Sequence, residues 1–134
     1  MTARTAIFGI GRMGQAIGYA MDKLGYDLFC VDVQREGIDT LSRMLEKDVS
    51  FSLNPDDHSS VMHFDPDIVI SSLPYHQNEK IAKWCIDNGI RYCDLGGRVD
   101  VSNDINQYAK EHGTKPVLTD LGLAPGWVNI IAEQ

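Results

Sequence analysis

Short apolar runs alternate with helix-like patterns along the whole chain. The first run, residues 5–9, is rich in Ile and Phe and has the length of a strand. The next stretch places apolar residues at helical spacing on one face, namely Met13, Ile17, Ala20 and Leu24. Gly25 then stands where a helix commonly ends. The opening of the chain therefore predicts a strand followed directly by a helix.

The same alternation continues along the rest of the sequence. Further strands are expected at residues 27–33, 49–53, 67–73, 91–95 and 116–121. Helices are expected at residues 38–45 and 77–88, and from a capping Ser102 to His112, while residues 54–64 fit a turn with a short helix. Because strict alternation gives a parallel sheet covered on both faces, we predict an α/β fold with a doubly wound parallel sheet of about six strands.

A glycine-rich segment joins the first strand to the first helix. Its sequence, Gly9-Ile10-Gly11-Arg12-Met13-Gly14, is a G-x-G-x-x-G motif in the strand-to-helix context that dinucleotide binding requires. The first glycine permits a tight turn, the second lets the backbone approach a pyrophosphate, and the third lets helix and strand pack closely. The motif favours a Rossmann-type cofactor site over a glycine-rich turn without a ligand.

An acidic residue, Asp32, follows at the end of the second predicted strand. A carboxylate at this position accepts hydrogen bonds from the adenosine ribose and repels the 2′-phosphate of NADP, so it favours NAD as cofactor, with NADP the weaker candidate. The alternative is a strand-end Asp that starts a turn. Arg35 lies close enough to soften this discrimination, and Arg12 is either a pyrophosphate ligand or a solvated charge.

The fourth predicted strand ends in small residues at the edge where ligands of parallel sheets bind. Ser71 and Ser72 leave room for a ligand, and Leu73-Pro74-Tyr75-His76 follows. Tyr75 is a candidate for contact with the nicotinamide, although wall packing is the alternative. His76 fits a solvated histidine better than an acid or base.

Two more strand ends carry an aspartate beside glycine. They are Asp94, followed by Gly96 and Gly97, and Asp120, followed by Gly122. Each carboxylate either orients an amine substrate or the nicotinamide, or forms an ordinary Asp-Gly turn. Asp94, together with Tyr75, is our candidate catalytic residue.

Composition narrows the class of partner. The net charge of −7 argues against nucleic acid and anionic membrane surfaces, which require clustered Lys and Arg. Three cysteines without a CxxC pair indicate free thiols, and the absence of a signal peptide and of a long apolar run predicts a cytoplasmic protein. The histidines and cysteines show no metal-ligand spacing, so no metal site is expected.

Three segments together resemble the saccharopine dehydrogenase-like family, and within it the lysine 6-dehydrogenases. The segments are IFGIGRMG, SSLPYHQNEKIAKWCIDNGIRYCDLGG and TDLGLAPGWVNII. The resemblance implies an oxidoreductase that oxidises a carbon–nitrogen bond of an amino acid and passes hydride to a nicotinamide. It implies a dinucleotide held by Gly9, Gly11, Arg12, Met13, Gly14 and Asp32. It further implies a nicotinamide end lined by Leu73, Pro74 and Tyr75, and a substrate bordered by Asp94, Gly96 and Gly97. Ser72, Gly96 and Gly97 are also among our candidate cofactor-binding residues.

The resemblance also bears on domain organisation. Residues 1–123 are expected to form the cofactor-binding domain, and residues 124–134 to begin a connection to a catalytic domain that the chain lacks. We therefore expect dinucleotide binding without turnover. We expect Trp127 and Ile130 to be either mobile or buried against a second copy of the chain, with weak self-association or fraying there, and the protein to form a homo-oligomer. A nucleotide-sensing regulatory domain of a channel or transporter is the alternative, but it leaves the L-P-Y and D-L-G-x-A-P-G segments unexplained.

Overall fold

The computed structural model describes residues 2–122, which form two compact parts, residues 2–72 and 73–122. The predicted connection at residues 124–134 lies outside the described residues, as do Trp127 and Ile130. Each part is described by itself below.

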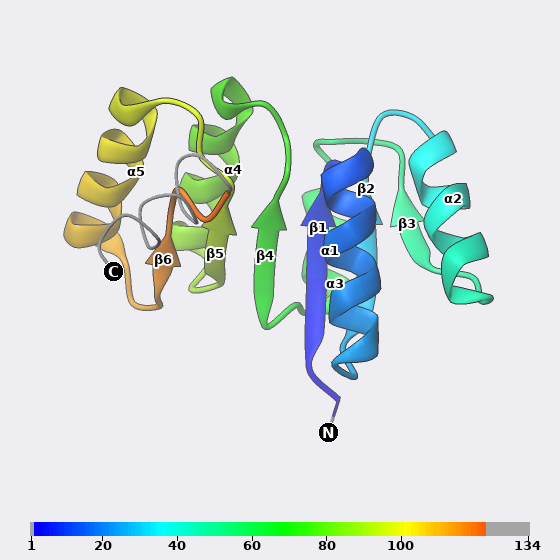
Figure 1. Cartoon of the computed structure of the whole chain (residues 1–134). Coiled ribbons are helices and arrows are strands. Elements are labelled where there is room, and N and C mark those ends of the chain that lie inside the picture. Colours follow the sequence, from blue (N-terminus) through cyan, green and yellow to red (C-terminus); the bar gives the residue numbers. More distant parts are fainter. Residues whose placement is uncertain (1, 123–134) are drawn as a thin grey trace. The chain divides into compact units, whose positions relative to one another are not determined.

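The first part alternates strands and helices from the start. Its elements are β1 (Arg4–Phe8), α1 (Arg12–Lys23), β2 (Asp27–Val31), α2 (Glu36–Leu45), β3 (Ser50–Ser52), α3 (His58–Phe64) and β4 (Ile68–Ser71). The strands are parallel in the order β3-β2-β1-β4 (Figure 1). Residues 54–64, ambiguous in sequence, contain α3, whose first turn is capped by Asp57 accepting from the Ser60 N–H.

Apolar side chains cover both faces of this sheet. One face carries a buried cluster that joins the strands to α2, formed by Ile7, Ile10, Leu28, Cys30, Ile38, Leu41, Leu45 and Val49, with Ile17 and Met21 of α1 against it. On the opposite face Phe29 packs on Phe64 of α3, with ring centroids 5.4 Å apart. Successive residues of β2 therefore point to opposite sides, as the pleat of a strand requires.

Helix α1 packs through glycines, which corrects the face predicted from its apolar residues. Met13 and Leu24 are 54% and 72% exposed, whereas Gly14 and Gly18 are buried. A Cβ on Gly18 would lie 2.7 Å from Cδ2 of Leu41, so α1 approaches α2 too closely for a larger residue. Of the predicted apolar face, Ile17 packs against the cluster, whereas Met13, Ala20 and Leu24 are exposed.

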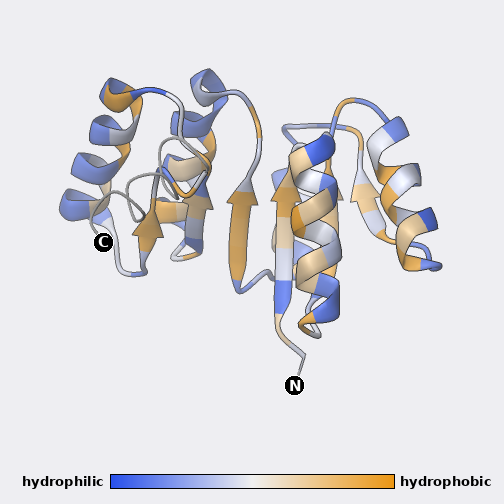
Figure 2. Ribbon diagram, viewed as in Figure 1, coloured by the Kyte–Doolittle hydropathy of each residue, from blue (hydrophilic) through white to orange (hydrophobic). Residues whose placement is uncertain are grey.

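The second part contains α4 (Tyr75–Asp87), β5 (Arg91–Asp94), α5 (Val99–His112) and β6 (Val117–Leu118). Strands β5 and β6 are parallel. Helix α4 ends at Asp87, one residue before the predicted end at residue 88. Gly89, which comes just after the helix, has a positive φ of 65°. In Figure 2 the outward turns of α5 are mostly hydrophilic, and β5 and β6 are hydrophobic. This amphipathic pattern explains why Ile105 of α5 is fully buried.

Helix α5 begins earlier than predicted. Its first residue is Val99, the preceding Arg98 makes no side-chain cap, and Ser102 lies inside the first turn. The Ser102 hydroxyl donates to Oδ1 of Asp120 at 2.8 Å, so it is engaged with a carboxylate and does not cap the helix.

The predicted fold class is confirmed. The described residues 2–122 have a Rossmann-like α/β fold with six strands, and the pairings within each part are parallel. Among residues 2–122, no helix combines the length and the apolar character needed to cross a membrane.

Candidate dinucleotide-binding site

The glycine motif forms the turn between β1 and α1. Gly9 has a φ of 90°, a conformation that glycine adopts without a steric penalty. Its N–H donates to the carbonyl of Val31 at 2.8 Å, and its carbonyl accepts from the Ser72 hydroxyl at 2.7 Å. The turn is therefore fixed from both neighbouring strands, β2 and β4.

The other two glycines of the motif differ in what surrounds them. A Cβ on Gly14 would lie 1.9 Å from the carbonyl oxygen of Gly9, so only glycine lets α1 start this close to the turn. A Cβ on Gly11 would meet no atom within 4 Å, and Gly11 is exposed. The backbone at Gly11 thus faces open space, which fits the close approach of a pyrophosphate.

Asp32 connects the end of β2 to this turn. Its Oδ2 accepts from the Ile10 N–H at 2.7 Å, and its Oδ1 accepts from the Gln34 N–H at 3.0 Å. A carboxylate offers about four lone-pair sites. The two hydrogen bonds therefore orient the group and leave each oxygen able to accept from a ligand hydroxyl.

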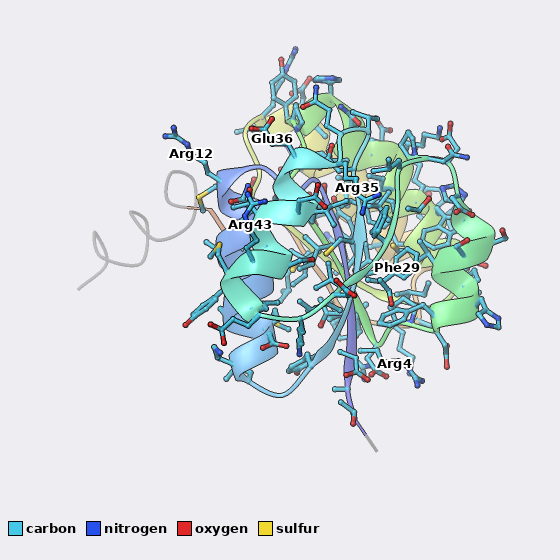
Figure 3. All side chains as sticks on the ribbon, turned by 90° about the vertical axis from the view of Figure 1, so that its right-hand side faces the viewer. Arg4, Arg12, Phe29, Arg35, Glu36 and Arg43 are labelled. Atoms are coloured by element: carbon cyan, nitrogen blue, oxygen red, sulfur yellow. The ribbon has the colours of Figure 1, made fainter. Side chains whose placement is uncertain are left out.

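A pocket of about 350 Å³ lies beside Asp32, and we call it the Asp32 pocket. Its lining consists of Ile10, Gly11, Arg12, Gln15, Asp32, Gln34, Glu36, Gly37 and Thr40. The pocket thus contains the second glycine of the motif and the predicted ribose ligand. Figure 3 shows Arg12 extending away from the ribbon, with Glu36 at the start of α2. The lining carries two carboxylates, Asp32 and Glu36, and one guanidinium, Arg12.

Sequence reasoning missed two residues that hold the turn. The Gln15 side chain donates to the Ile10 carbonyl at 3.2 Å, and a Cβ on Gly37 would lie 1.7 Å from that same oxygen. Gly37 therefore allows α2 to contact the turn directly. The available signal was an isolated glycine in the first turn of a helical pattern, where glycine is disfavoured without a packing reason.

The remaining predicted cofactor ligands of the first part take different positions. Arg12 is exposed and Met13 is 54% exposed, so both side chains are free to meet a ligand, and their roles stay predictions. Ser72 holds the Gly9 carbonyl and would lie 3.0 Å from a Cβ on Gly14. The contacts of Ser72 are therefore with the turn itself.

In the second part, Asp94 is the centre of a buried polar cluster. It is only 1% exposed. Its Oδ1 accepts from the N–H groups of Gly96 and Asp120 at 2.9 and 3.1 Å, and its Oδ2 accepts from the Tyr92 hydroxyl at 2.8 Å. Burial, reinforced by the charge of Asp94, raises the pKa of Tyr92 far above its usual range, so Tyr92 remains a donor. The carboxylate joins the end of β5 to the segment after β6.

Gly96 and Gly97 follow Asp94 in backbone conformations that favour glycine. Their φ angles are 77° and 138°. A Cβ on Gly96 would lie 2.2 Å from Oδ1 of Asp120, and one on Gly97 would lie 3.3 Å from Cβ of Tyr75. The two glycines therefore admit Asp120 on one side and Tyr75 on the other.

Tyr75 lies at the start of α4 and is 38% exposed. The Arg98 guanidinium is 5.8 Å from its ring centroid, and the His76 ring meets it edge-on with centroids 5.8 Å apart. Arg98 also pairs with Asp100 at 2.8 Å. Leu73 is half-buried and Pro74, the cap residue of α4, is exposed. That Leu73, Pro74 and Tyr75 line a nicotinamide stays a prediction.

Comparison with solved structures supports the fold. Saccharopine dehydrogenase (L-Glu forming) from Saccharomyces cerevisiae matches with a TM-score of 0.79 at 16% identity, over 97% of this chain and 29% of that chain. The myo-inositol dehydrogenase from Lactobacillus casei, in complex with NAD(H), gives 0.72 at 18% identity, over 89% and 36%. The WlbA dehydrogenase from Chromobacterium violaceum, in complex with NADH, gives 0.69 at 16% identity, over 87% and 34%. The chain therefore spans about a third of the length of these dehydrogenases.

The turn, the Asp32 pocket and the parallel strands are the features of a dinucleotide-binding domain. The family described as saccharopine dehydrogenase NADP binding domain matches residues 5–120. The chain belongs to this family. The match includes the L-P-Y segment, which the alternative of a channel regulatory domain does not explain, and the D-L-G-G segment.

Proposed function

We propose that this chain is the cofactor-binding domain of an NAD-dependent dehydrogenase that oxidises a carbon–nitrogen bond of an amino acid, of the lysine 6-dehydrogenase or saccharopine dehydrogenase type. Family membership supports a nicotinamide dinucleotide as the cofactor. The observation that carries the choice of NAD is the Asp32 carboxylate, which two backbone N–H groups orient in a pocket that also contains Gly11.

The residues of the pocket fit such a cofactor. The open space at Gly11 admits a pyrophosphate against backbone N–H groups at the start of α1. Asp32 accepts from the ribose hydroxyls, and Glu36 adds a second negative charge that disfavours a 2′-phosphate. The nicotinamide, when bound, supplies the hydride acceptor.

The contacts of Asp94 and Tyr75 support different roles in this proposal. Asp94 is buried and accepts three hydrogen bonds within the chain, which supports a positioning role for the loop at Gly96 in place of direct contact with substrate. Tyr75 is partly exposed beside Arg98 and stays our candidate for contact with the substrate or nicotinamide.

Calorimetric titration with NAD and NADP tests the cofactor choice. We expect NAD to bind more tightly, and Asp32→Ala to weaken NAD about tenfold because it removes a charged hydrogen-bond acceptor. Asp27→Ala is the matched control, because it removes the same charge from the exposed first residue of β2. Tighter binding of NADP than of NAD by the unmodified protein would contradict the proposal.

The donor class needs a separate assay. NADH formation is measured with lysine, with saccharopine and with myo-inositol as donors, because a structural neighbour is an inositol dehydrogenase. Because this chain spans about a third of the length of the dehydrogenases it matches, the assay uses the full-length protein that contains this domain, and we expect turnover there with an amino-acid donor. Turnover with the inositol alone would overturn the carbon–nitrogen assignment while leaving NAD binding intact.

A further inference from the structure

Arg35 stands between two residues of the Asp32 pocket but does not line it. Its chain neighbours Gln34 and Glu36 both face that pocket. The Arg35 side chain lines a neighbouring hollow instead, together with Asp39 and Phe51. In Figure 3 Arg35 and Arg12 lie on opposite sides of Glu36. The cation nearest in sequence to Asp32 is therefore directed away from the proposed ribose site.

Two contacts hold Arg35 in this position. Its Nε lies 3.1 Å from Oδ1 of Asp39, one helical turn further along α2. Its guanidinium carbon lies 5.0 Å from the ring centroid of Phe51 on β3. The side chains of Arg35 and Asp39 are 62% and 44% exposed, so the ion pair is a weak surface contact. Both contacts are reversible at small cost.

Release of these contacts would change the charge of the Asp32 pocket. Guanidinium groups bind phosphate through a planar fork of donors, whereas Asp32 and Glu36 repel it. Because its chain neighbours Gln34 and Glu36 line the pocket, the backbone of Arg35 lies beside it, and a released guanidinium would move toward the pocket by rotation of the side chain.

We propose that Arg35 is a cofactor-specificity residue that Asp39 and Phe51 hold outside the Asp32 pocket, and that this hold keeps the chain selective against the 2′-phosphate of NADP. The inference rests on the proposed dinucleotide site. It assigns to Asp39 and Phe51, which do not line the pocket, a share of the choice between NAD and NADP.

Competition binding tests this directly. NADP displaces NADH from the protein, and the fluorescence of bound NADH reports both affinities. We expect Asp39→Asn to strengthen NADP binding about threefold. Phe51→Leu should strengthen it by about the same factor, because it removes the cation–π contact without changing charge. The double variant should gain about tenfold if the two contacts are independent. NAD affinity should stay within about twofold throughout, since Asp32 is unchanged.

The Arg35→Gln background separates release of the arginine from the simple loss of a negative charge. Arg35→Gln alone should leave NADP affinity nearly unchanged, because the side chain is held outside the pocket. In that background Phe51→Leu should give no gain, and the gain from Asp39→Asn should shrink to the residual effect of one removed charge. Glu79→Gln is a second control, because it breaks an equivalent exposed pair with Lys83 on α4.

The outcomes distinguish this inference from the proposed function. Failure of the unmodified protein to bind either dinucleotide would overturn the proposed function. Two other outcomes would overturn only the role of Arg35, provided that the protein binds NAD. One is that the substitutions strengthen NADP binding equally with and without Arg35→Gln, and the other is that they strengthen it in neither background. Circular dichroism of each variant checks the fold, and Phe51→Leu decides the matter if Asp39→Asn does not fold.

Discussion

The carboxylates of Asp32 and Asp94 occupy equivalent places in the two parts of the chain. Each lies at the carboxyl end of a parallel strand, and each accepts hydrogen bonds from two backbone N–H groups. Asp94 also accepts from the Tyr92 hydroxyl and is 1% exposed, whereas Asp32 is partly exposed and lines a pocket. A strand-end aspartate thus fixes the loops around it in both parts, and the partly exposed Asp32 also lines a pocket.

This difference gives the two residues different energetic roles. Removing a buried acceptor leaves its donors without partners, and each such group costs about 1–3 kcal/mol. Removing a partly exposed acceptor costs less, because water replaces it. Asp94 should therefore matter mainly for stability, and Asp32 mainly for binding.

Substitution of the two aspartates should give the largest effect. We expect Asp94→Ala to lower the free energy of unfolding by about 3–5 kcal/mol, because the Tyr92 hydroxyl and the Gly96 and Asp120 N–H groups lose their acceptor. Asp32→Ala should cost about 1 kcal/mol. Urea denaturation measures both. Equal losses for the two variants would contradict the comparison.

Replacing one glycine in each part extends the comparison between the two parts. Gly96→Ala should cost about 2–3 kcal/mol, because the residue has a positive φ and its Cβ would lie 2.2 Å from Oδ1 of Asp120. Gly11→Ala should leave stability within about 0.5 kcal/mol, since its Cβ meets open space. Gly11→Ala should nevertheless weaken NAD, because the methyl group occupies the side on which the pyrophosphate approaches. If folded Gly11→Ala bound NAD with unchanged affinity, this turn would not be the pyrophosphate-binding site.

Both parts should lose stability at alkaline pH through their buried thiols. Burial raises the pKa of Cys30 from 9.0 to about 12, and burial with the nearby Asp94 charge raises that of Cys93 to about 11. Below pH 9 both states keep the proton, so stability is unaffected. Above it the unfolded thiol ionises first, and each thiol should cost up to about 1.4 kcal/mol per pH unit until its folded pKa is reached.

The alkaline slope is measured by urea denaturation under reducing conditions between pH 8 and pH 11. Cys30→Val replaces the thiol with a side chain of similar size that does not titrate. Cys30→Val should reduce the loss of unfolding free energy per pH unit by the contribution of one thiol, whatever its effect on stability at pH 8. An unchanged slope would show that Cys30 is accessible to solvent.

The glycine motif and Asp32 could be predicted from sequence because local spacing defines them. The G-x-G-x-x-G pattern places three glycines in one turn, and an acidic residue at the next strand end is local to β2. Gly37 and Gln15 could not be predicted, because both act on the Ile10 carbonyl through the packing of α2 and α1. Long-range approach of helices leaves little trace in apolar periodicity.

In the second part, long-range contacts again determine what the sequence pattern could not predict. The D-L-G-G segment predicted a turn and a candidate catalytic carboxylate at Asp94. The Asp94 carboxylate accepts hydrogen bonds from the Tyr92 hydroxyl and the Asp120 N–H, and the Asp120 carboxylate accepts from the Ser102 hydroxyl. Ser102 and Asp120 are brought together only when α5 and the segment after β6 fold. The same tertiary contact explains why Ser102 is not the predicted helix cap.

Two serines give the smallest and most selective test of the comparison. The Ser72 hydroxyl donates to the Gly9 carbonyl in the first part, and the Ser102 hydroxyl donates to the Asp120 carboxylate in the second. Ser102→Ala should cost about 1.5 kcal/mol of stability, because its acceptor is charged, and Ser72→Ala about 1 kcal/mol. Only Ser72→Ala should weaken NAD, about threefold, since it loosens the turn that faces the pyrophosphate. NAD titration and urea denaturation of both variants separate the loss of affinity from the loss of stability. If lower stability alone weakened NAD binding, both variants would show the weakening. If Ser102→Ala weakened NAD as much as Ser72→Ala, the polar cluster around Asp94 would also belong to the cofactor site.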